Sequence, residues 1–289
     1  MNYAQRWFGS VALQALGRSR SDRQKLYQGA RGLRILVFHD LNDDEFDRFR
    51  ALVEWSLERM DPGVPEDADA LLEGRFRPPP RDRLLLTFDD GFESHHRAAE
   101  WMATQRLRGT FFVVPSLLGR DVAGYLAHHR ARGVEAFRFP RAARGLGPSQ
   151  VREMDAMGHR IGSHNDAHRD LGKLHSPADV AAEIQGAVDG VSAALGSPCR
   201  DFAIAFGQPS NLSDEARRQL VSSGLRVYSC VRGLNVPGRT PRFLLRHTVE
   251  HRDPRVFTRL CIRGGADRHM AKAWLGLVRH VGPLPAAPP

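Results

Sequence analysis

The chain has 289 residues, of which 42% are hydrophobic and 26% are charged, the composition of an ordinary soluble globular protein. This length suits one large α/β domain or two small ones. The net charge of +9 does not indicate nucleic-acid binding, because all but three of the 42 basic residues are arginines scattered along the chain. The sequence has no basic helix, zinc-finger spacing or basic stripe interleaved with aromatic residues, so we expect no nucleic-acid partner.

The N-terminal segment, residues 1–32, is predicted to be a helical extension. Trp7, Phe8, Val11 and Leu13 would form one side of an amphipathic helix. The segment lacks the basic start and uninterrupted apolar core of a secretion signal, and it is too short and polar to span a bilayer. We favour a helix packed on the domain, with a helix lying on the membrane surface as the alternative.

The number and spacing of the cysteines indicate whether the protein belongs in an oxidising or a reducing compartment. Cys199, Cys230 and Cys261 are odd in number and widely spaced, with no CxxC pair. They fit buried thiols in a reducing compartment better than a disulfide framework. Together with the missing export signal, this predicts a cytoplasmic protein, with peripheral membrane association as an alternative.

Short apolar runs alternate with helix-like stretches along the rest of the chain. Seven runs are predicted to be strands: 33–39, 83–88, 109–114, 159–164, 201–206, 225–230 and 243–249. Helices are predicted at 43–60, 94–107, 148–157, 176–195, 213–223 and 253–262. Alternating units of this kind predict an α/β fold with about seven parallel strands, a distorted (β/α) barrel that is complete or incomplete.

Local signals set some boundaries. Ser176 is a suitable N-cap before Pro177 at the first helical position, and Gly196 is a suitable stop for the same helix. The barrel is expected to span residues 33–265. Residues 61–82 are predicted to be a long connection and 119–147 an inserted surface loop. Residues 266–289 are predicted to form a C-terminal helix and a Pro-rich tail.

Polar residues occur where the predicted strands end, and barrels of this type build their sites at the carboxyl ends of strands. These residues are His39, Asp89, Asp90, His164, Gly207 and His247. The coincidence predicts one site at that end of the strands.

His164 and His168 are four residues apart, a spacing that brings two imidazoles to one point in a helix or tight turn. Alone, this pattern is common on protein surfaces. Two imidazoles and a carboxylate, however, make a three-ligand set for a divalent metal with a position left for water, which is the catalytic pattern. A cation would also offset the repulsion between Asp89 and Asp90.

These motifs resemble those of the polysaccharide deacetylases (NodB-homology domain, carbohydrate esterase family 4). The residues LTFDDGF (86–92) and IGSHNDAHRDL (161–171) are similar to the first two motifs of that family, and FAIAFG (202–207) to the third. The resemblance covers residues 33–250 in the expected order. It implies a distorted (β/α) barrel that removes acetyl groups from N- or O-acetylated sugars, glycans or glycoconjugates.

The resemblance also implies roles for individual residues. Asp90, His164 and His168 would hold a divalent metal, zinc before cobalt, nickel or manganese. A metal-bound water would attack the acetyl carbonyl, with Asp89 as the general base. His247 is the nearest match to the catalytic acid of the family, with His251 and His39 as alternatives.

Substrate contacts are assigned to His39, Phe206 and Gly207. The third motif departs from the family pattern, because Ile204 and Ala205 stand where an aromatic residue and a proline are typical. An arginine that pairs with the base in many members is also missing from the motif, although Arg200 is close. The alternative function is therefore a homologue that binds glycans with impaired catalysis. His95, His96, His128, His129 and His175 are predicted to be surface residues without a role.

Overall fold

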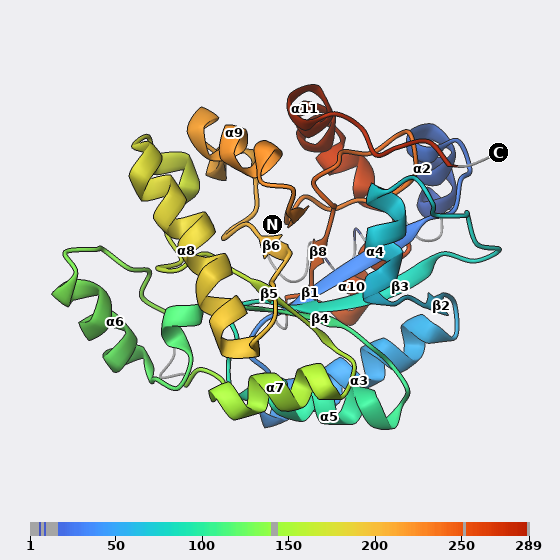
Figure 1. The fold of residues 1–289 in the computed structure, drawn as a ribbon. Coiled ribbons are helices and arrows are strands. Elements are labelled where there is room, and N and C mark those ends of the chain that lie inside the picture. The colour runs from blue at the N-terminus through green and yellow to red at the C-terminus, as the bar shows by residue number, and fades with distance from the viewer. Residues whose placement is uncertain (1–5, 7–8, 10–16, 140–143, 251–252, 288–289) are drawn as a thin grey trace. The chain divides into compact units, whose positions relative to one another are not determined.

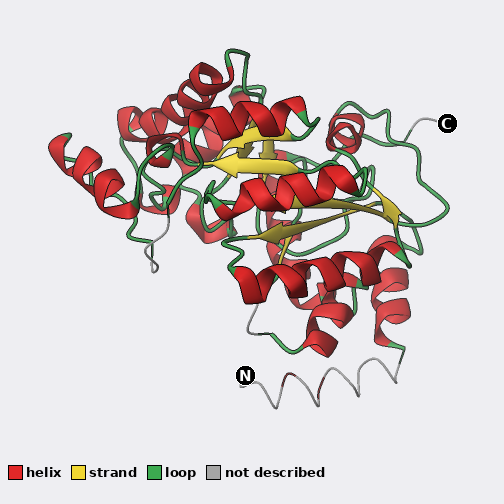
Figure 2. Ribbon diagram, turned by 90° about the horizontal axis from the view of Figure 1, so that it is seen from below, coloured by secondary structure: helices red, strands yellow, loops and turns green. Residues whose placement is uncertain are grey.

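The computed structural model describes residues 6, 9, 17–139, 144–250 and 253–287 (Figure 1). Contacts divide the chain into two compact units. The first unit comprises residues 1–38, 43–85 and 230–289, and the second comprises 39–42 and 86–229. Strand β3 (Arg83–Phe88) begins in the first unit and ends in the second. Helices and loops make up most of the described chain, and the strands are short (Figure 2).

The second unit contains a parallel sheet in the order β7-β6-β5-β4-β3. Its strands are β4 (Thr110–Val113), β5 (Arg160–Ser163), β6 (Asp201–Ala203), β7 (Arg226–Tyr228) and the end of β3. The β4–β5 pairing sets Phe111 opposite Ile161 and Val113 opposite Ser163. Since all these strands run in one direction, their carboxyl ends meet at one edge of the sheet.

Helices connect these strands. They are α5 (Ser94–Thr104), α6 (Val122–Ala131), α7 (Pro148–Ala156), α8 (Pro177–Leu195) and α9 (Asp214–Ser222), with short 3₁₀ turns at Pro115–Leu117, Leu171–Lys173 and Pro209–Asn211. Helix α7 lies beside α5 and α8, and α8 beside α9 (Figure 1).

The boundaries of α8 confirm the local signals in the sequence. The Ser176 side chain accepts a hydrogen bond from the backbone N–H of Asp179 at the N-terminus. At the other end Gly196 takes a left-handed φ of 74°, which costs glycine little. Both interactions involve residues close in sequence, so the sequence alone could predict them.

The first unit contains β1 (Leu33–Phe38) paired in parallel with β8 (His247–Thr248), and β2 (Asp61–Pro62) paired in parallel with the start of β3. Its helices are α2 (Arg18–Tyr27), α3 (Asp43–Leu57), α4 (Pro65–Leu72), α10 (Arg255–Ile262) and α11 (Ala271–Val281), with a 3₁₀ turn at Asp267–Met270. Parallel strands joined by helices in both units confirm the predicted α/β class.

Two stretches have more structure than the sequence indicated. Residues 61–82, predicted as a connection, include β2 and α4, and residues 119–147, predicted as a surface loop, include α6. Trp7, Phe8, Val11 and Leu13 lie outside the described residues. Within the described part of the chain, no helix has the length and apolar character needed to cross a membrane.

Candidate active site

The turn after β3 places the two adjacent aspartates. Asp89 and Asp90 directly follow Phe88, the last residue of the strand, and both are buried. Asp90 takes a φ of 82° and Gly91 a φ of 77°. A Cβ at Gly91 would lie 2.8 Å from the Cβ of Val113, so this position requires glycine both for its φ and for its close approach to β4.

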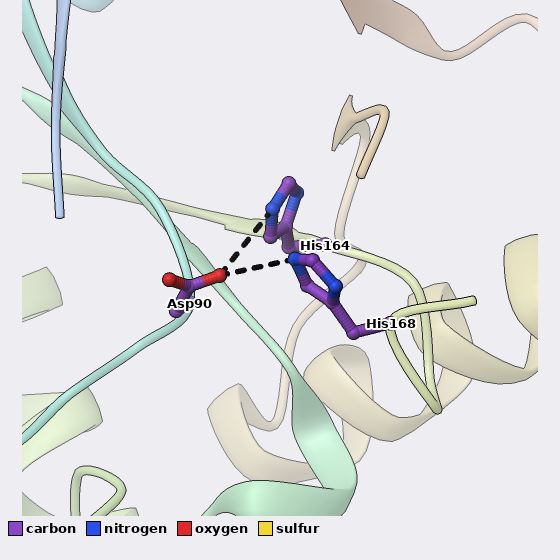
Figure 3. Close-up of side chains that lie close together, drawn as sticks. All are labelled: Asp90, His164 and His168. Atoms are coloured by element: carbon purple, nitrogen blue, oxygen red, sulfur yellow. Dashed lines mark ion pairs between the residues drawn. The ribbon is translucent and has the colours of Figure 1, made fainter. Parts of the chain in front are cut away.

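Asp90, His164 and His168 converge on one point (Figure 3). The Oδ1 atom of Asp90 lies 3.2 Å from Nε2 of His168 and 3.6 Å from Nε2 of His164. All three residues are buried, and one ligand atom from each lies within 4.8 Å of the others. The structure thus brings together the three residues predicted to hold a metal.

The arrangement fits a divalent cation. The Nδ1 atom of His164 lies 2.8 Å from the carbonyl oxygen of Ala203, to which it can donate only as N–H. With the hydrogen on Nδ1, Nε2 of a neutral imidazole would offer its lone pair to a cation bound between His164 and Asp90. Two ligands about 2.1 Å from a tetrahedral ion lie roughly 3.4 Å apart, a value between the two observed separations.

The charges at the site favour an ionised Asp90. Burial by itself raises the pKa of this carboxyl. The interaction with His168 and the nearby His39 and His164 outweigh burial and hold the pKa well below its usual range. An ionised carboxylate is the form that ligates a metal.

Asp89 lies next to the same imidazole. Its Oδ2 atom is 3.8 Å from Nε2 of His164, and its side chain is 1% exposed. The two aspartates therefore flank His164, with Asp90 also facing His168. Arg200, considered from the sequence as a partner for the base, is exposed, and its carbonyl oxygen accepts a hydrogen bond from the backbone N–H of Arg226.

Unusual backbone conformations cluster at this site. Four of the six non-glycine residues with positive φ in the described chain belong to it: Asp90, Asn165, His168 and Phe206. Each such residue costs about 1–3 kcal/mol and persists only where its surroundings enforce it. Strain of this kind gathers at functional sites, and the sequence pattern gave no sign of it.

Three phenylalanines surround the ring of His168. The centroid distances are 4.7 Å to Phe137, 5.4 Å to Phe139 and 5.0 Å to Phe206. Phe206 is 41% exposed, although it is a large apolar side chain. Phe137 and Phe139 belong to the segment predicted as a surface loop, and neither was predicted to be a site residue. Gly207, with a φ of 62°, is buried directly after Phe206.

A hydrogen bond joins the side chain of His95 to the backbone of His39. His39 is exposed, and its carbonyl oxygen lies 3.1 Å from Nε2 of His95. The prediction that His95 is a surface residue is wrong, because it is fully buried against Phe88 and Phe111. Burial lowers the pKa of His95 to about 4, so the imidazole is neutral at pH 7 and donates Nε2–H to His39.

The prediction of a surface position is also wrong for His129. This residue is buried, and its Nε2 atom lies 2.8 Å from Oγ of Ser116. Ser116 in turn donates to the carbonyl oxygen of Asp166, in the loop between the two candidate metal ligands. His129 faces inward because α6 folds against the chain there, which local sequence does not reveal.

His247, predicted to be the general acid, belongs to the first unit. It pairs with Leu36 of β1 and is 5% exposed. Burial, followed by the positive charges of Arg232 and Arg34, lowers its pKa well below the usual value. Its role stays a prediction. The alternative acid His251 lies outside the described residues.

The family model for polysaccharide deacetylase matches residues 76–228, which include the aspartate pair and both histidines. No curated protein shows significant sequence similarity to the chain.

Solved structures share the fold. IcaB from Ammonifex degensii has a TM-score of 0.61 at 20% identity, over 82% of this chain and 97% of that one. A de-N-acetylase from Aggregatibacter actinomycetemcomitans has a TM-score of 0.61 at 15% identity, over 79% and 99%. The deacetylase PplD from Streptococcus pyogenes has a TM-score of 0.58 at 18% identity, over 80% and 98%. These likenesses confirm the predicted fold, a distorted and incomplete (β/α) barrel.

Proposed function

Because the chain belongs to the polysaccharide deacetylase family, we propose that it is an active metal-dependent hydrolase that removes an acetyl group from an N- or O-acetylated sugar, glycan or glycoconjugate. The observation that carries the proposal is the buried convergence of Asp90, His164 and His168, with Asp89 next to them. Three ligands leave a coordination position for water, as catalytic sites require. Zinc is the proposed metal, because catalytic zinc sites use two histidines and a carboxylate, with cobalt, nickel or manganese as alternatives.

Different residues of the chain are proposed to bind the metal and to transfer protons. A divalent ion held by Asp90, His164 and His168 would supply Lewis acidity, lowering the pKa of water and polarising the acetyl carbonyl. Asp89 would accept the proton of the attacking water as general base. The reaction then needs a second group to protonate the departing amine or alcohol, because an unprotonated amine is a poor leaving group.

Substrate contacts are proposed for His39, Phe206 and Gly207. Phe206 offers an exposed ring beside His168, and such a ring can pack on the C–H face of a sugar. His39 is exposed and lies close enough to contribute to the lowered pKa of Asp90. The altered third motif, with Ile204 and Ala205, keeps open the alternative of a glycan-binding homologue with impaired catalysis.

Acetate release tests the proposal directly. Zinc-loaded protein is expected to release acetate from N-acetylhexosamine saccharides or O-acetylated sugars. A chelator should abolish the release, and added zinc should restore it. Acetate can be measured with a coupled assay and saccharide binding by calorimetry. Saccharide binding without acetate release by the metal-loaded protein would contradict the proposal and favour the glycan-binding alternative.

The proposed acid, His247, has its own test. Its Nε2 atom is buried without a hydrogen-bond partner among the described residues. As an acid, His247 would matter most when the leaving group is poor, so His247→Ala should keep the metal and lose far more rate on an acetamide than on an activated aryl acetate. Steady-state kinetics on both substrates check this. Equal losses would remove His247 from the mechanism and direct attention to His39 or His251.

A further inference from the structure

Helix α8 carries a carboxylate on its buried face. The buried positions of the helix are Val180, Glu183, Ile184, Ala187, Val188 and Val191, an apolar stripe interrupted by one acidic residue. Glu183 is 2% exposed. Burying a carboxylate is costly unless hydrogen bonds compensate it, so its presence in this stripe requires a specific partner.

The partner is the backbone on both sides of His168. Glu183 accepts the N–H of Ala167, at 3.2 Å to Oε2 and 3.3 Å to Oε1. Its Oε2 atom also accepts the N–H of Arg169 at 3.3 Å. Burial raises the pKa of Glu183, and these two N–H groups oppose that effect by stabilising the charged form.

The two candidate histidine ligands are held differently. The ring of His164 is oriented through Nδ1, which lies 2.8 Å from the carbonyl oxygen of Ala203. The Nδ1 atom of His168 is buried and has no hydrogen-bond partner among the described residues. His168 also has a φ of 50°, a strained conformation for a residue with a side chain. Its position therefore depends on its backbone and on the packing of its ring.

Two further hydrogen bonds fix the backbone on either side of His168. The carbonyl oxygen of Ala167 accepts the N–H of Phe137 at 3.0 Å. The side chain of Asn165 donates to the carbonyl oxygen of Arg169 at 3.1 Å. Glu183 supplies the acceptor for the N–H groups that flank His168.

We propose that Glu183 is a positioning residue that fixes the strained backbone of His168 and thereby sets the affinity and geometry of the metal site. The proposal rests on the proposed function for the identity of the metal site. It goes further by assigning metal affinity to a buried carboxylate on α8 that does not touch the metal. Partners that orient metal ligands typically contribute 10- to 100-fold to metal affinity.

Two variants remove the carboxylate oxygens of Glu183 to different extents. Glu183→Gln keeps one oxygen for the flanking N–H groups, and Glu183→Met keeps the length of the side chain with no oxygen. Asp67→Asn is the matched control, because Asp67 in the first unit is also a buried carboxylate that accepts a backbone N–H, that of Val64 at 2.9 Å. All three variants are expected to lower the melting temperature of the metal-free protein.

Zinc affinity shows whether Glu183 positions the metal ligand His168 or only stabilises the fold. Competition with a chromogenic chelator should show Zn²⁺ binding weakened about 10- to 100-fold in Glu183→Met, less in Glu183→Gln and not in Asp67→Asn. The visible absorption of Co²⁺-loaded protein should change in the Glu183 variants, since it reports coordination geometry.

Wild-type Zn²⁺ affinity together with an unchanged Co²⁺ spectrum in Glu183→Gln and Glu183→Met would overturn the proposal. If Glu183→Met does not fold, an unchanged Zn²⁺ affinity and Co²⁺ spectrum in Glu183→Gln would also overturn the proposal. The measurement needs no catalysis. A wild-type protein that binds zinc but releases no acetate would contradict the proposed function, and the comparison of variants would still decide the role of Glu183.

Discussion

Replacing Asp89 by asparagine (Asp89→Asn) is expected to leave the zinc content unchanged and to lower kcat for acetate release by roughly 100-fold or more. The amide has the shape of the carboxylate but cannot accept the proton of the attacking water. Asp89 is buried, with its Oδ2 atom 3.8 Å from Nε2 of His164. Bulk solvent therefore cannot readily replace it as a base. Elemental analysis and steady-state kinetics on one N-acetylated saccharide check both parts.

The neighbouring substitution is the matched control. Asp90→Asn removes the carboxylate that faces both imidazoles, so zinc content itself should fall. Adding excess zinc should then restore part of the activity of Asp90→Asn and none of that of Asp89→Asn. If both variants lose the metal completely, the proposed division between base and ligand is wrong.

Replacing His164 by alanine (His164→Ala) is expected to remove nearly all bound zinc and to lower acetate release to the background of metal-free protein. His164 is one of three ligands, and its ring is already oriented by the contact with the Ala203 carbonyl. With two ligands left, a site of this kind holds zinc weakly. Elemental analysis after dialysis against metal-free buffer measures the loss.

The exposed histidine His175 provides a control for His164→Ala. His175→Ala should keep one zinc per chain and full activity. Circular dichroism of both variants shows whether the fold is retained. A folded His164→Ala protein with wild-type zinc content would contradict the assignment of the site.

Local signals in the sequence predicted most of the helices and strands and the residues proposed to hold the metal. The apolar run at 83–88 followed by Asp89, Asp90 and a glycine predicts a buried strand with an acidic turn, because strand propensity and turn chemistry act between near neighbours. The cap at Ser176 and the stop at Gly196 are local for the same reason. The spacing of His164 and His168 indicated the ligand set, although it did not fix its geometry.

Only the tertiary structure decided which side chains support those ligands. Phe137 reaches the ring of His168, and Glu183 reaches the backbone beside it, through contacts between segments that are distant in sequence. His95 was predicted on the exposed side of a helix and His129 in a surface loop, yet both are buried. Their burial depends on which face of α5 or α6 meets the rest of the chain. The positive φ of His168 has the same origin, because surrounding hydrogen bonds impose a conformation that its own sequence disfavours.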